Sequence, residues 1–426
     1  MCPSKCAPDG MPAESLVTKE NIIPNRLTAF RNRDFRVYLI ARFLATIAWQ
    51  MMDVGVGWHV YQLSRDPLDL GLVGLAQFIP FVLLVLPAGH VADRFNRILV
   101  LRIAYFIGAM SVGILLLLTI KGSTNVAYIL GAVFIFGAAR AFFMPTVQAM
   151  VRNLVPIETF PSAVALNSSV FQVAVICGPA LGGLLYLAGP RTLFAIVLAL
   201  LMITIFLLGF VCPVRSQASG TSGGVQDVLE GLRFVLKRSI VLGAISLDLF
   251  AVLFGGVTAL LPVYASDILH VGPPGLGALR AAPAVGAALT AVAIAIWPIR
   301  GRPGLWMFGG ITAYGLATIT FGLSGTFLVS LAALCLIGSG DMVSVFIRQT
   351  LVQLQTPDRI RGRVSAVASL FIGASNELGG FESGLTARLF GPVISVVGGG
   401  VATILVVAAY LRLFPQLRSM RTLAEP

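Results

Sequence analysis

The segment LPAGHVADRFNRILVLRIAYFIGAMSVGILLLLTI, residues 86–120, joins a short charged loop to an unbroken apolar run. The run over 98–120 is long enough to cross a hydrocarbon core of about 30 Å as a helix. Similar runs recur along all 426 residues, of which 57% are apolar and 11% are charged, whereas soluble domains carry about 25% charge. Because backbone groups in lipid must pair within their own segment, the sequence predicts an all-α membrane protein.

Twelve transmembrane helices are predicted, in two pseudo-symmetric six-helix bundles. The N-terminal bundle covers 37–213 and the C-terminal bundle covers 240–414, with tails at 1–36 and 415–426. The linker at 214–239 contains a Gly/Ser-rich stretch and an amphipathic helix that we expect at the membrane interface. The expected spans are 37–62, 68–89, 98–120, 124–150, 160–187, 191–213, 240–266, 274–298, 304–324, 326–353, 362–388 and 391–414.

Positive charge is distributed unequally between the two sides of these spans. The side with both tails holds most of the lysines and arginines outside the spans, and Arg348 at the end of span ten is counted with them. The other side holds Arg65, Lys121, Arg191 and Arg388. The positive-inside rule therefore predicts a multi-pass protein of the bacterial inner membrane with both termini in the cytoplasm. The net charge of +12 is explained by this topology, so nucleic-acid binding is not expected.

An internal repeat relates the two halves. A shift of 201 positions aligns spans four and five with spans ten and eleven. The matched pairs include Gly137 with Gly338, Gly178 with Gly379 and Gly183 with Gly384. Two halves with the same membrane orientation are related by an axis along the membrane normal. Chance similarity between glycine-rich helices is the alternative.

The loop between spans two and three contains Gly89, Asp93, Arg94 and Arg97. It resembles the signature loop of the major facilitator superfamily, with Asn96 where the family more often has glycine; asparagine also tolerates a left-handed backbone. The resemblance implies a cytoplasmic gate. Gly89 would let two helices approach, and Asp93 would lie at the positive end of a helix from the other half, for which the start of span eleven is the candidate. The alternative is that these charges serve only the topology.

Span five contains Gly178, Pro179, Gly182 and Gly183, with Ala174 one turn earlier. This pattern is similar to the glycine-proline motif of exporters in the same superfamily, although its usual leading glycine is Ala174 here. Glycines form a flat surface and proline bends the helix. We expect a close, sliding contact between the two halves, with simple helix packing as the alternative.

Ionisable side chains within the spans are costly in lipid and are candidates for function. Arg140 on span four resembles the buried arginine of drug-exporting facilitators. In that family spans one, four, seven and ten line the cavity, and here they carry Asp53, Arg140, Asp248 and Asp341. An arginine that faces carboxylates would hold them ionised until a proton or substrate breaks the pair, which proton antiport requires. Glu377 on span eleven is a further candidate for substrate or proton coupling, and Glu382 and Asn376 on the same span are further candidates for a proton route. Permanent salt bridges are the alternative.

Two other features bear on a binding cavity. Arg280, early in span eight, could extend outward to water or contact an anionic substrate. Aromatic residues could coat the cavity or pack in the core: Trp49, Phe78, Phe142, Phe143, Phe171 and Phe254.

The resemblance extends from Arg31 to Phe414. The segments RNRDFR at 31–36, LDLF at 247–250 and LRAAPAVG at 279–286 are similar to the branch that contains enterobactin siderophore exporters. This resemblance implies a secondary transporter that exports a siderophore-like or drug-like molecule by proton antiport through alternating access, without a cofactor. Transport of a lysophospholipid or a metal ion by the same fold is the alternative.

Other classes fit less well. The three histidines and five scattered cysteines form no metal-site pattern. A membrane enzyme would need a nucleophile–base or metal constellation, and a channel would need rings of filter residues. The sequence shows neither pattern, so we expect no enzyme activity. The expected partners are a small-molecule substrate, protons and the lipid bilayer, and the expected state is a monomer.

Overall fold

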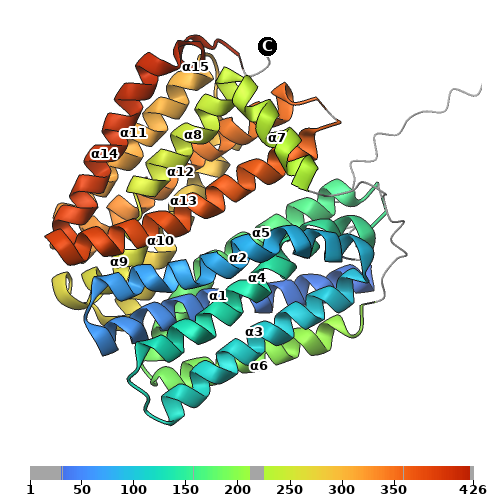
Figure 1. Cartoon of the computed structure of the whole chain (residues 1–426), viewed down its shortest axis with the longest axis vertical. Coiled ribbons are helices and arrows are strands. Elements are labelled where there is room, and N and C mark those ends of the chain that lie inside the picture. The colour runs from blue at the N-terminus through green and yellow to red at the C-terminus, as the bar shows by residue number, and fades with distance from the viewer. Residues whose placement is uncertain (1–29, 31, 157, 212–224, 358, 423–426) are drawn as a thin grey trace, which may run out of the picture.

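The computed structural model describes the chain except residues 1–29, 31, 157, 212–224, 358 and 423–426. Helices form two bundles, coloured blue to green and yellow to red in Figure 1. The N-terminal half contains α1 (Arg33–Ser64), α2 (Pro67–Arg94), α3 (Arg97–Ile120), α4 (Val126–Leu154), α5 (Phe160–Tyr186) and α6 (Pro190–Leu208). After α7 (Val225–Lys237), the C-terminal half contains α8 (Ser239–Phe254), α9 (Val257–Val263), a π-helical turn (Tyr264–Ile268), α10 (Gly272–Ile296), α11 (Pro303–Leu323), α12 (Phe327–Gln355), α13 (Arg361–Phe390), α14 (Pro392–Leu413) and α15 (Pro415–Ser419).

The predicted fold class, an all-α membrane protein with two helical bundles, is confirmed. In the described part of the chain, eleven helical segments are long and apolar enough to cross a membrane, and one of them joins α8, α9 and the π-helical turn. The twelfth is α13, which is 30 residues long but carries Asn376, Glu377 and Glu382. We call the side on which α1 and α8 begin the termini side, and the other the opposite side.

Short polar side chains fix where several helices begin. Asn32 accepts hydrogen bonds from the backbone N–H groups of the first turn of α1, and Asp66 does so for α2. Asn125 caps α4 in the same way. Asn96 has φ −60° and caps α3 by accepting from the N–H of Ile98. Asn96 therefore has no left-handed backbone: its side chain satisfies an otherwise unpaired N–H at the start of α3.

Helix packing repeats between the halves. A Cβ atom on Gly137 of α4 would collide with the backbone of Gln77 on α2, and one on Gly338 of α12 would collide with the backbone of Pro283 on α10. The two glycines are the pair that the 201-residue shift aligns. This equivalent use of both glycines supports the internal repeat.

The linker helix α7 lies against the start of α13. Glu230 of α7 forms ion pairs with Arg359 and Arg363, and Gly231 lies close to the backbone of Arg363. The predicted amphipathic helix is thus a separate helix packed on the C-terminal half. The Gly/Ser-rich stretch before it lies outside the described residues.

Candidate transport cavity

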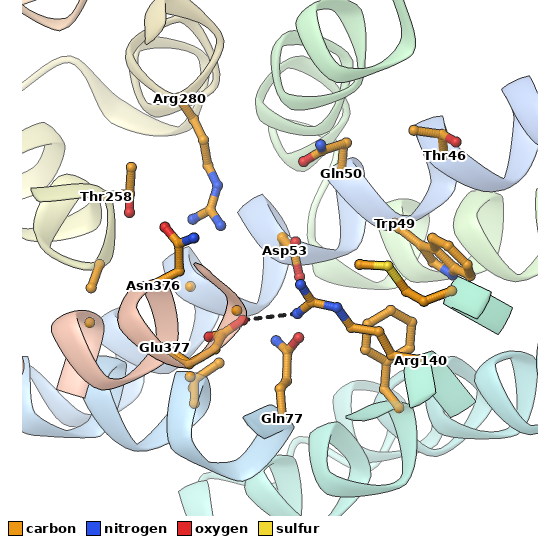
Figure 2. A pocket seen from close by; sticks show the side chains of 18 of the residues that line it. Thr46, Trp49, Gln50, Asp53, Gln77, Arg140, Thr258, Arg280, Asn376 and Glu377 are labelled. Carbon is orange, nitrogen blue, oxygen red and sulfur yellow. Dashed lines mark hydrogen bonds and ion pairs between the residues drawn. The ribbon is translucent and has the colours of Figure 1, made fainter. Parts of the chain in front are cut away.

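A cavity of about 660 Å³ lies between the two halves (Figure 2). Side chains from α1 to α5 line it from the N-terminal half, and side chains from α9, α10 and α13 line it from the C-terminal half. This volume lies in the range that accommodates a drug-sized ligand. Span ten, α12, contributes no described lining residue, so the expectation that spans one, four, seven and ten form the walls is only partly correct.

The centre of the cavity holds an ion pair that joins the two halves. Arg140 on α4 donates from Nη1 to Oε1 of Glu377 on α13 at 2.9 Å. Asp53 on α1 and Arg280 on α10 line the same space and act electrostatically on Glu377 (Figure 2). The structure therefore brings Asp53, Arg140 and Glu377 together, and places Arg280 at the cavity and not at the membrane surface.

Aromatic rings beside a cation form the N-terminal wall of the cavity. The Trp49 ring lies 3.7 Å from that of Phe143 and 5.3 Å from that of Tyr105, measured between centroids. Cζ of Arg42 lies 5.4 Å from the centroid of the Phe171 ring. All five residues line the cavity. Packed aromatic rings next to a guanidinium group suit a ligand with aromatic and negatively charged groups.

Two donors in this wall lack partners. Nε of Arg42 and Nε1 of Trp49 are buried without a hydrogen-bond acceptor in the described structure. Buried polar atoms are nearly always hydrogen-bonded, so an unpaired pair of donors in one wall calls for an explanation. Both atoms are enclosed by protein, so the side chains would have to change conformation before a ligand could supply an acceptor.

Asp248 and Asp341 lie away from this cavity, which corrects the expectation that they share it with Arg140. Asp248 on α8 pairs with Arg348 on α12 and accepts a hydrogen bond from Oγ of Ser344 at 3.0 Å. Asp341, two turns before Arg348 on α12, lies within electrostatic range of both. Neither aspartate is among the described residues that line the cavity. The reason is geometric: these charged positions on α8 and α12 form a contact inside the C-terminal half.

Close backbone contacts join the two halves on the opposite side. At Gly183 of α5, an added Cβ would collide with the carbonyl oxygen of Pro273 and lie 3.1 Å from Cα of Gly277 on α10. At Gly384 of α13, it would lie 2.8 Å from the carbonyl oxygen of Pro67 and 3.0 Å from Cα of Gly71 on α2. The two halves thus meet through a pair of equivalent contacts that tolerate no side chain.

The other two glycines of the span-five motif make contacts within the N-terminal half. Gly178 and Gly182 lie against Gln50 and Met51 of α1, within the N-terminal half. The contact between halves uses Gly183 and the backbone of Pro179, which lies beside Gly277. The motif therefore serves both alternatives, packing within one half and contact with the other.

Ion pairs surround these contacts on the opposite side. Arg65 donates to Oδ1 of Asp267 at 2.9 Å, and Tyr61 donates to the other oxygen of the same carboxylate. Arg388 pairs with Asp66 at 3.4 Å. Asp66 and Asp267 are 201 positions apart, so equivalent aspartates each bind an arginine of the other half.

The signature loop on the termini side shows no comparable closure. A Cβ atom on Gly89 would meet nothing within 4 Å, and the same holds for Gly362 at the start of α13. The predicted close approach of helices at Gly89 is therefore absent in this conformation. Arg94 is exposed, Arg97 begins α3, and the side chain of Asp93 lies outside the described structure.

Sequence reasoning missed two arginines, Arg42 in the cavity wall and Arg348 inside the C-terminal half. Arg348 was assigned to the loop charges, yet its side chain is only 4% exposed. The available signal was its position seven residues after Asp341, which places both on one face of a single helix.

A substrate-sized cavity between two helical bundles, with an ion pair across their interface, suits a secondary transporter. The family match and the relatives given next show a transporter of the major facilitator type and not an enzyme. Residues 25–425 match the family model of transmembrane secretion effectors, and the chain belongs to this family.

Relatives and solved structures agree with this assignment. The enterobactin exporter EntS of Citrobacter koseri is 26% identical over 396 residues, which cover 91% of this chain and 93% of that protein. EntS of Escherichia coli strain SMS-3-5 is 25% identical over the same shares. Among solved structures, an inward-facing, occupied bacterial homologue of the human lysosomal transporter Spinster superposes with a TM-score of 0.73 at 14% identity, covering 91% of this chain and 98% of that one. The nucleoside transporter NupG gives a TM-score of 0.68 at 18% identity and covers 90% and 99%.

Proposed function

We propose that the chain exports an anionic, aromatic small molecule of the siderophore type by proton antiport. The observation that carries this proposal is the cavity wall in which the guanidinium of Arg42, without an ion-pair partner among the described residues, lies beside the packed aromatic rings of Trp49, Phe143 and Phe171. Similarity to enterobactin exporters over 91% of the chain points to the same class of substrate.

The charges of the cavity favour an anion over a cation. Three arginines and two carboxylates line it. Arg140 and Glu377 neutralise each other, which leaves Arg42 and Arg280 against Asp53. Neither Arg42 nor Arg280 forms an ion pair with a described residue, so both are available to a carboxylate or phenolate oxygen of the substrate. This balance is why we favour a siderophore-like substrate over the cationic drugs that many exporters carry.

Proton coupling follows from the ion pair across the interface. While Glu377 is ionised, Arg140 holds α13 to α4 and keeps the halves together around the cavity. When a proton neutralises Glu377, that attraction is lost, Arg140 is left to pair with Asp53, and the two halves are released to change conformation without substrate. Proton-driven return of the empty carrier, with the substrate held by Arg42 and Arg280 in the other half-cycle, is the relation that an antiporter needs.

We further propose that both termini lie in the cytoplasm and that the transporter works as a monomer. The excess of lysine and arginine on the termini side supports this orientation. In that orientation, the glycine contacts and ion pairs of the opposite side close the cavity toward the outside. The conformation described here is then the one that loads substrate from the cytoplasm.

Transport into proteoliposomes under an imposed pH gradient tests the proposal. A catecholate siderophore, a macrolide and a cationic dye are compared at equal concentration. We expect gradient-dependent movement of the siderophore and at least tenfold less of the dye. Replacement of Arg42 and Arg280 by Gln removes both free cations and should abolish siderophore transport, whereas Arg412→Gln, on the exposed end of α14, should retain it.

Two outcomes separate the parts of the proposal. If siderophore transport is unchanged when the pH gradient is collapsed, proton coupling is excluded and the proposed substrate class is kept. Transport of the dye alone would remove the substrate class.

A further inference from the structure

A second cavity of about 660 Å³ lies at the surface of the C-terminal half, between α10, α11 and α12. Gly309 leaves open space in the groove, Gly310 and Gly340 pack α11 closely against α12 beside it, and Leu336 and Val343 add apolar walls. None of its described lining residues lines the cavity between the halves. It is therefore a separate groove, set among helices that span the membrane.

Tryptophans mark the depth of this groove in the bilayer. Trp297 ends α10 and is 74% exposed, and Trp306, in the first turn of α11, is 53% exposed. Exposed tryptophans concentrate where lipid headgroups meet the hydrocarbon core. The loop between α10 and α11 thus lies at headgroup level, and the groove extends from it into the hydrocarbon region.

Two arginines without partners stand at the headgroup end of the groove. Arg300 and Arg302 line the cavity and are exposed, and neither side chain forms an ion pair or hydrogen bond within the described part of the chain. By contrast, the intramembrane arginines Arg140 and Arg348 both have carboxylate partners. Arg302 also caps the N-terminal end of α11, where the helix dipole adds positive potential.

We propose that this groove binds an anionic phospholipid. The phosphate lies between Arg300 and Arg302, and an acyl chain fills the apolar groove along Gly309 toward Val343. Basic pockets between transmembrane helices, with an apolar extension, have the chemistry of anionic lipid headgroup sites. Because the groove is outside the substrate path, the lipid is a bound partner and not a transported molecule.

Native mass spectrometry of the full chain in detergent tests the proposal. The protein is titrated with phosphatidylglycerol and with phosphatidylethanolamine of the same acyl chains. We expect the anionic lipid to bind at least tenfold tighter. Replacing Arg300 and Arg302 by Gln should weaken its binding by about fivefold for each arginine, while Arg412→Gln on the same side should not change it.

A second set of substitutions tests whether an acyl chain occupies the groove. Gly309→Leu fills the space between the helices and should lower the affinity for both lipids, whereas Gly398→Leu, an exposed glycine with open space on α14, should not. The proposal is overturned if the two lipids bind equally to the unmodified protein, or if the Arg412 variant loses as much affinity as the double variant. It is also overturned if glycerol 3-phosphate displaces the lipid at equal concentration, because the site would then recognise a soluble phosphate ester and not a lipid.

Discussion

Among the described residues, two arginine–carboxylate pairs lie within the membrane-spanning helices, and they differ in what they connect. Arg140 and Glu377 join opposite halves across the cavity, with side chains 31% and 21% exposed. Arg348 and Asp248 join α12 and α8 of one half, with side chains 4% exposed each. A pair between moving bodies can be broken and remade during transport, whereas a pair inside one body holds that body rigid. The position of a charge relative to the interface, more than its depth in the membrane, therefore separates a coupling role from a structural one.

The largest effect is expected from Arg348→Leu. It removes the cation that faces Asp248 and Asp341, and leaving buried charge uncompensated costs roughly 3–5 kcal/mol. The midpoint of thermal unfolding in detergent should fall steeply. Asp248→Asn should lower the midpoint less, because Arg348 still has the carboxylate of Asp341 within electrostatic range. The Arg348 variant could instead keep the unfolding midpoint of the unmodified protein and lose only proton coupling. That result would contradict a purely structural role and would place Asp248 and Asp341 in the transport mechanism.

Glu377→Gln should leave stability nearly unchanged and reduce transport driven by a pH gradient at least tenfold. The amide cannot exchange a proton, so protonation can no longer break and remake the pair with Arg140. Uptake and release of substrate without a gradient should persist. Glu382→Gln on the same helix is the matched control, since Glu382 is not among the described lining residues. Equal loss in both variants would contradict a specific role for Glu377.

The two glycine contacts of the opposite side should respond equally to substitution. Gly183→Leu and Gly384→Leu each force a side chain into backbone of the other half, which should hold that side open. Labelling of Leu70→Cys, in a background without the five native cysteines, should increase several-fold in both. Gly89→Leu should not change it, because Gly89 has open space around it. A response at only one of the two positions would show that the halves do not share the contact equally.

Asp267→Asn should give the smallest effect. The side chains of Arg65 and Asp267 are 55% and 42% exposed, and exposed ion pairs contribute at most about 1 kcal/mol. Labelling of Leu70→Cys should rise by no more than about fivefold, and the difference from the unmodified aspartate should shrink as salt increases. A change as large as that of Gly384→Leu would mean that the charges, and not the glycine contacts, hold the opposite side closed.

The fold could be predicted because its causes are local. Apolar runs of sufficient length, loop charges and the spacing of matched glycines are all present in the linear sequence, and each has one main physical interpretation. The starts of α1, α2 and α4 follow from asparagine and aspartate caps in the same way.

The site could be predicted only in part, because burial and pairing depend on helix rotation. Arg140 and Asp53 were placed on cavity-lining spans, and they line the cavity. Asp341 sits at the position of span ten that the repeat pairs with Arg140, but its side chain lies near Asp248 and Arg348. Sequence spacing shows which residues share a helix face, yet it does not show which neighbour that face meets.

Span seven is divided where Phe254 ends α8 and Val257 begins α9, and the N–H of Gly255 makes the last hydrogen bond of α8, to the carbonyl of Ala251. The Tyr314 hydroxyl donates to the carbonyl of Gly255 at 2.8 Å, which satisfies one acceptor released by the break. The segment before the break is anchored by Asp248, while the segment after it presents Thr258 and Pro262 to the cavity. A continuous helix would have to move as one rigid body. The break instead lets α9 tilt with the bound substrate while α8 keeps its place through the pair of Asp248 with Arg348.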